Sequence, residues 1–192
     1  NEVVFHYYPG ILSVAEESTA FPGVSHPTYA GGLGFNMKWN MGWMNDTLRY
    51  IELDPVHRKY DSHLLTFSMI YAYTEKYVLP ISHDEVVHGK RSLLSKMPGD
   101  DWQKRANYRL YLAFMMAHPG KKLLFMGSEF GQWEEWTEAH SLNWKHLEYE
   151  FHQQLHHFCR SLNHFYLNSP VLYRNDFDPS GFEWIDLHDH EN

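Results

Sequence analysis

Three short runs of apolar residues each end in a cluster of polar side chains. The runs cover residues 12–15, 77–81 and 122–126, and a weaker candidate covers residues 33–39. Their apolar character is nearly continuous, which is typical of parallel strands that are covered on both faces. We therefore expect a buried parallel strand at each position, followed by a polar loop.

Between these runs the apolar residues recur with helical spacing. Residues 107–118 are strongly apolar and stop at Pro119 and Gly120, which is a helix stop signal. Residues 62–73 are a further candidate. A long amphipathic helix is indicated by apolar residues at three- and four-residue steps, namely Leu147, Phe151, Leu155, Phe158, Leu162 and Phe165. Strands that alternate with helices predict an α/β fold, with about four βα units before Ser169.

The pattern changes after Ser169 and Pro170. Short extended pieces follow, separated by turn residues, and residues 182–187 read as a strand. We expect residues 170–192 to begin a separate all-β domain. The chain opens with Asn1 instead of Met and stops directly after this run, so we expect it to be a piece of a longer protein.

Charge and cysteine content narrow the functional classes. The 24 acidic and 16 basic residues give a formal net charge of −8, which does not favour binding to nucleic acid or to anionic membranes. No apolar run has the length of a membrane span, and no signal peptide is recognisable. The single cysteine, Cys159, cannot form an internal disulfide, so we expect a cytoplasmic protein.

The polar clusters contain residues suited to glycosyl chemistry. In a βα barrel, functional groups collect where the strands end. Glu16 or Glu17 and Asp84 follow two of the expected strands, and a pair of carboxyl groups could act there as acid and base. His83 could orient a sugar hydroxyl. The alternative is that these acids cap helices or pair with Lys and Arg.

The 15 histidines raise the question of a metal site. His152 and His156 would share one face of the long helix, but the sequence contains no His-Glu-x-x-His motif and shows no third ligand. We therefore expect these histidines to lie on the helix surface, and we expect no metal and no cofactor.

Ordered motifs then cover nearly the whole chain. They are AEESTAFPGVS at residues 15–25, KWNMGWM at 38–44, ISHDEVVHGK at 81–90, MPGD at 97–100, GKKLLFMGSEFGQ at 120–132, Glu135-Trp136 and SLNW at 141–144. The sequence therefore resembles the α-amylase family, and within it the glycogen branching enzymes. The resemblance implies that residues 1–169 form the C-terminal half of a (β/α)8 TIM barrel, about strands 5 to 8, before the all-β domain.

The resemblance also implies roles for single residues. Glu16 matches the general acid/base, Asp84 the carboxylate that stabilises the transition state, and His83 a substrate-binding histidine. Glu17 competes with Glu16 for the acid role. Because side chains alternate along an extended segment, we expect one member of this pair to point into the site.

The reaction implied is the transfer of an α-1,4-glucan chain to a 6-hydroxyl by a retaining mechanism. The nucleophilic aspartate of the family follows the fourth barrel strand and has no counterpart here. We expect it in a missing N-terminal half of the same protein, so this piece alone should be inactive. Candidate glucan-binding aromatic residues, which could instead be core, are Trp39, Trp43, Trp133 and Trp136. The rival interpretations are an amylase-like hydrolase and a non-catalytic glucan-binding relative.

Overall fold

The computed structural model describes residues 1–187, so part of the expected all-β segment, residues 188–192, lies outside the described residues. Four parallel strands form one sheet in chain order, β1-β2-β3-β4. They span Val14–Ala15, Met37–Trp39, Tyr77–Ile81 and Lys121–Leu124. The helices α1 to α6 span Glu2–Tyr7, Met41–Glu52, His63–Thr66, Leu93–Lys96, Asp101–Ala117 and Glu150–Asn168. The predicted parallel α/β arrangement is confirmed.

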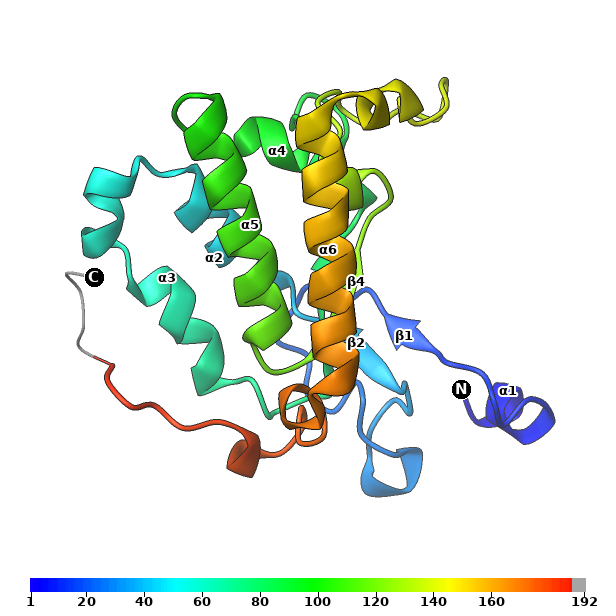
Figure 1. Ribbon diagram of the computed structural model, residues 1–192. Coiled ribbons are helices and arrows are strands. Elements are labelled where there is room, and N and C mark those ends of the chain that lie inside the picture. The colour runs from blue at the N-terminus through cyan, green and yellow to red at the C-terminus, as the bar shows by residue number, and fades with distance from the viewer. Residues whose placement is uncertain (188–192) are drawn as a thin grey trace.

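Three long helices lie on one face of the sheet. Helices α2, α5 and α6 follow β2, β3 and β4, and Figure 1 shows α5 and α6 side by side in front of the strands. Leu79 and Ile81 of β3 point to this face and join the same core as Trp43 of α2 and Leu155 of α6. Sequential strand order with helices on one face is the arrangement of a barrel segment, because doubly wound sheets carry helices on both faces.

The connection from β1 to β2 differs from the others. Between residues 16 and 36 its only regular structure is one 3-10 turn, Thr28–Ala30. No helix therefore covers the outer face of β1 and β2 from this crossover. A cleft of about 800 Å³ lies there and is lined by crossover residues together with Lys38, Trp39 and Tyr71. We call it the crossover cleft.

The core is built where the three helices meet β3. Trp43 is fully buried and stacks on Tyr111 with ring centroids 6.2 Å apart. Thr47 Oγ1 and Tyr111 Oη are hydrogen bonded at 3.1 Å. Cys159 of α6 is also buried in this core, and burial raises the pKa of its thiol to about 12.

Two of the sequence expectations need correction. Residues 182–187 form no strand: the segment after the turn at Pro179–Gly181 has no strand partner among the described residues, and an extended segment without a partner cannot form a ladder. The candidate at residues 62–73 divides into α3 and a 3-10 turn at Phe67–Ile70. The predicted domain boundary at residue 169 stays a prediction.

Candidate active site

The expected acids lie at the same edge of the sheet. Glu16 and Glu17 follow β1 directly, and His83 and Asp84 follow β3. Because β2 separates these strands and neighbouring strands are about 4.8 Å apart, the two exits lie about 10 Å apart along the edge. Long side chains can bridge much of that distance, so the edge is suited to act on one extended substrate.

Strand register separates Glu16 from Glu17. Val14 pairs with Met37 and Ala15 pairs with Lys38, so side-chain alternation puts Glu17 on the face of Ala15 and Lys38. Alternation puts Glu16 on the opposite face. That face carries none of the three long helices, and Glu16 is exposed there.

Glu17 is committed to an ion pair. Its Oε2 lies 2.5 Å from Nζ of Lys38, a buried lysine whose side chain is 5% exposed. The hydrogen bond from Lys38, followed by the one from Thr19, lowers the pKa of Glu17 to about 2. A carboxyl group that stays ionised cannot serve as a proton donor near neutral pH. The contacts of Glu17 therefore favour Glu16 as the acid.

The turn after β3 presents Asp84 and His83. Ser82 caps the 3-10 turn His83–Val86, where its Oγ accepts from the Asp84 amide at 3.2 Å and its own amide donates to Glu85 at 2.5 Å. This reciprocal cap buries Glu85 and leaves Asp84 and His83 outside, 46% and 49% exposed. His83 Nε2 lies 3.2 Å from Asp84 Oδ1. The two groups thus form a preassembled polar pair that faces solvent.

Aromatic contacts connect this pair to the loop after β4. The rings of His83 and Phe125 are 6.1 Å apart, and Phe125 meets Trp136 edge to face at 5.3 Å. The amide of Trp136 donates to the carbonyl of Val86 at 3.0 Å, which ties the two loops together. The sequence interpretation did not include Phe125. Its position at the end of the fourth apolar run was the available signal.

The four candidate tryptophans occupy different environments. Trp39 lines the crossover cleft, and Trp136 lines a second cleft of about 500 Å³ formed within residues 132–145. Trp133 is partly buried against the core. Trp43 was proposed as a glucan-binding residue, but its side chain is 0% exposed. That proposal is wrong for the described structure, because a ring enclosed between α2 and α5 has no face left for a sugar.

The acids do not lie in either of these two clefts. Neither the crossover cleft nor the cleft at residues 132–145 is lined by Glu16 or Asp84. Both acids lie instead at the open edge of a four-stranded sheet. The structure brings His83, Asp84 and Trp136 into one connected group, and it places Glu16 and Trp39 at the exits of the two neighbouring strands.

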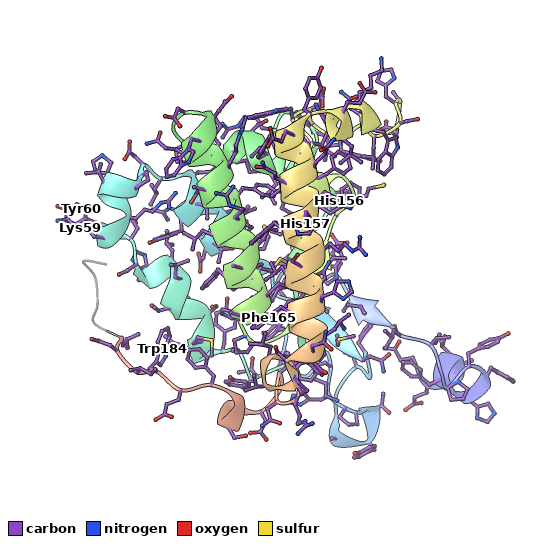
Figure 2. The ribbon with its side chains drawn as sticks, viewed as in Figure 1. Lys59, Tyr60, His156, His157, Phe165 and Trp184 are labelled. Carbon is purple, nitrogen blue, oxygen red and sulfur yellow. The ribbon has the colours of Figure 1, made fainter. Side chains whose placement is uncertain are left out.

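The histidines of α6 have separate surroundings. The expected surface position is wrong for His152, which is buried with its Nδ1 2.8 Å from the carbonyl oxygen of Phe130. His156 and His157, labelled in Figure 2, are exposed. Within residues 1–187 no group of three or more His, Cys, Asp or Glu side chains could hold a metal ion. Within the same residues no helix is long and apolar enough to cross a membrane.

Comparison with solved structures bears on the fold. A type I pullulanase from Bacillus subtilis, solved in complex with maltose, matches 90% of this chain and 28% of its own, with a TM-score of 0.62 and 15% identity. An alpha-amylase from H. orenii matches 90% of this chain and 39% of its own, with a TM-score of 0.54 and 16% identity. These likenesses confirm the predicted fold class, the C-terminal half of a (β/α)8 barrel.

Comparison with curated sequences is more specific, although no family model matches the chain. The 1,4-alpha-glucan branching enzymes GlgB of Halothermothrix orenii and Aquifex aeolicus are each 58% identical over 191 residues, which cover 100% of this chain and 30% of each relative. The enzyme of the same name from Synechocystis is 57% identical over 192 residues, 25% of its length. By sequence the chain is thus similar along its whole length to 1,4-alpha-glucan branching enzymes, and it spans between 25% and 30% of the length of these relatives.

Proposed function

We propose that the protein containing this chain is a branching enzyme of glycogen synthesis, which cleaves an α-1,4-glucan and transfers the released chain to a 6-hydroxyl. The observation that carries the proposal is the identity of 57% to 58% to enzymes of that name along the entire chain. Glycogen or amylose is the proposed substrate. A cytoplasmic location fits the single buried cysteine.

Glu16 is the proposed general acid and base. As the acid it donates a proton to the leaving 4-oxygen, and as the base it later removes the proton from the 6-hydroxyl of the acceptor. Its exposed position after β1 allows contact with a glucan, while the ion pair of Glu17 with Lys38 leaves Glu17 unavailable for this work. The nucleophile of a retaining reaction is proposed to come from a strand outside this chain.

Asp84 and His83 are proposed to bind the sugar at the reacting centre. A carboxylate favours the positive charge that develops on an oxocarbenium-like sugar. The contact between His83 Nε2 and Asp84 Oδ1 orients both groups, and each keeps about half of its surface free for hydroxyl groups. Trp39, Trp133 and Trp136 are proposed to contact the donor or acceptor glucan, since aromatic faces stack on sugars.

The first test compares Glu16→Gln with Glu17→Gln in the full-length protein that carries this chain. We expect Glu16→Gln to lower the branching rate by about 10²- to 10⁴-fold while glucan binding is retained, because only proton transfer is lost. Glu17→Gln should stay active. If Glu17→Gln is inactive and Glu16→Gln is active, the two roles are reversed.

The reaction itself is read by proton NMR of amylose incubated with the full-length protein. New anomeric signals of 1,6-linkages without new reducing ends support branching. Reducing ends without 1,6-linkages identify a hydrolase and contradict the proposal. If neither product forms while glucan binds, the non-catalytic interpretation replaces it.

A further inference from the structure

Lys38 holds the residues on both sides of Glu16. Its backbone pairs with Ala15 across β1 and β2. Its Nζ donates to Glu17 Oε2 at 2.5 Å and to the carbonyl of Thr19 at 2.8 Å. The residue before Glu16 and the residue after it are therefore both bound to one buried lysine. We call Lys38, Glu17 and Thr19 the Lys38 cluster.

Burial makes the Lys38 cluster persistent. The lysine is 4% exposed, and a buried ammonium group is costly unless it is paired and hydrogen bonded. Glu17 and Thr19 provide those partners, so opening the cluster would leave a buried charge without compensation. The segment after Glu16 is consequently held at its near end by an interaction that does not open easily.

A second buried acid holds the far end of the same segment. Glu75, 6% exposed, accepts from the amides of Val24 and Ser25 at 2.8 Å each and from Ser25 Oγ at 2.5 Å. Burial would raise the pKa of Glu75, but the hydrogen bonds from Ser25 and Val24 outweigh it and lower the pKa. Residues 17–25 are thus fixed at both ends without any helix in the crossover.

We propose that Lys38, acting through Glu17, is a positioning residue for Glu16. The ion pair forms on the same face of the sheet that carries α2, α5 and α6 at the other strands, and it turns Glu16 to the opposite face, toward the edge that also presents Asp84. The inference rests on the proposed role of Glu16. Misplacement of a reacting group by about 1 Å can lower a rate by about 10²-fold, so the effect falls on turnover and not on glucan affinity.

The experiment measures branching kinetics of the full-length protein with amylose. Lys38→Met keeps the length of the side chain and removes the donor, and Glu17→Ala removes the acceptor. We expect each to lower kcat by about tenfold or more while KM stays within about twofold. Glu17→Gln retains an oxygen that accepts from Lys38 Nζ and is expected to restore most of the kcat lost in Glu17→Ala.

Lys59→Met is the matched control. Figure 2 shows Lys59 beside Tyr60 at the outer margin of the molecule, with its Nζ 5.3 Å from the centre of the Tyr60 ring. The same substitution at this exposed lysine should leave kcat and KM unchanged. Thermal unfolding of each variant identifies a protein that has lost its fold, and Glu17→Ala then carries the test because its site is partly exposed.

The outcomes separate this inference from the function beneath it. If Glu16→Gln is dead while Lys38→Met and Glu17→Ala keep the wild-type kcat, the positioning role is wrong and the catalytic role of Glu16 stands. The positioning role is also wrong if KM changes as strongly as kcat. It is wrong as well if the kcat of Glu17→Gln is as low as that of Glu17→Ala. If the unaltered protein forms no 1,6-linkages, the proposed function is itself wrong, and the positioning role falls with it.

Discussion

The two sides of the sheet are held together by different chemistry. On the β1–β2 side, buried ionic groups hold an irregular crossover through the Lys38 cluster and Glu75. On the β3–β4 side, three helices cover the strands and the contacts are apolar, with Trp43, Leu79 and Tyr111 almost fully enclosed. A crossover without an α-helix can therefore be held in place when buried charged groups satisfy its backbone amides and carbonyls.

The largest expected effect is on the β3–β4 side. Trp43→Ala should lower the free energy of unfolding by about 3–5 kcal/mol, because the indole is fully buried and leaves a cavity. On the other side Tyr29, which is 91% exposed in the crossover, gives the contrast. Tyr29→Ala should change stability by no more than about 0.5 kcal/mol. The free energy of unfolding is measured by urea denaturation. Equal losses in Trp43→Ala and Tyr29→Ala would contradict the distinction between the two sides.

A somewhat smaller effect should follow acidification of the β3–β4 side. Burial lowers the pKa of His118 to about 4 from 6.5, and its ring contacts Ser68 Oγ and the Pro119 carbonyl. As the pH falls, His118 is therefore protonated in the unfolded chain at a higher pH than in the folded protein. Stability is full above about pH 6.5 and falls by up to about 3 kcal/mol as the pH drops to about 4.

The measurement is the urea midpoint between pH 7 and pH 4. His118→Phe should lose this part of the pH dependence, whereas His157→Gln on the exposed surface of α6 should keep it. If the urea midpoint of His118→Phe still falls with pH as in the unaltered protein, other groups cause the acid sensitivity.

The smallest effect is local and belongs to the β1–β2 side. Glu75→Ala removes the acceptor of the Val24 and Ser25 amides, at a cost of about 1–3 kcal/mol. Hydrogen exchange should accelerate at Val24 and Ser25 while the amides of α5 stay protected. Glu75→Gln keeps one acceptor oxygen and should show a smaller change. Uniform acceleration along the chain would mean that the crossover is not an independent unit.

The sequence predicted the helix-covered side of the fold well. Strand β3 at Tyr77–Ile81 coincides with its apolar run, and α5 and α6 follow their periodic patterns. Helix α2 was not recognised from its pattern. Its buried stripe contains Thr47 between the apolar positions, and its start depends on Asn40, whose side chain accepts from the Trp43 amide. Because a polar residue occupies one of the buried positions, the helical spacing of apolar residues is interrupted in the sequence.

The crossover side was harder to read because its order comes from pairs distant in sequence. Glu75 contacts Ser25 and Val24, which lie 50 and 51 positions away in the sequence, and no local pattern encodes such a contact. Strand β1 is shorter than its apolar run because, among the described residues, only β2 pairs with it. Lys38 did leave a signal, a single charge inside an apolar run. The resemblance matched Glu16 to the acid and left Glu17 as its competitor, and the strand register and the contact with Lys38 separate the two.

The burial of Cys159 has a practical consequence for spectroscopy. Its thiol is enclosed in the core and, with a pKa near 12, does not react readily with maleimide reagents. The chain contains no other cysteine. A cysteine introduced at the exposed Tyr29 would therefore take up a spin label or fluorophore selectively within this chain. The crossover beside Glu16 can in this way be followed in real time while the proposed glucan substrate is added.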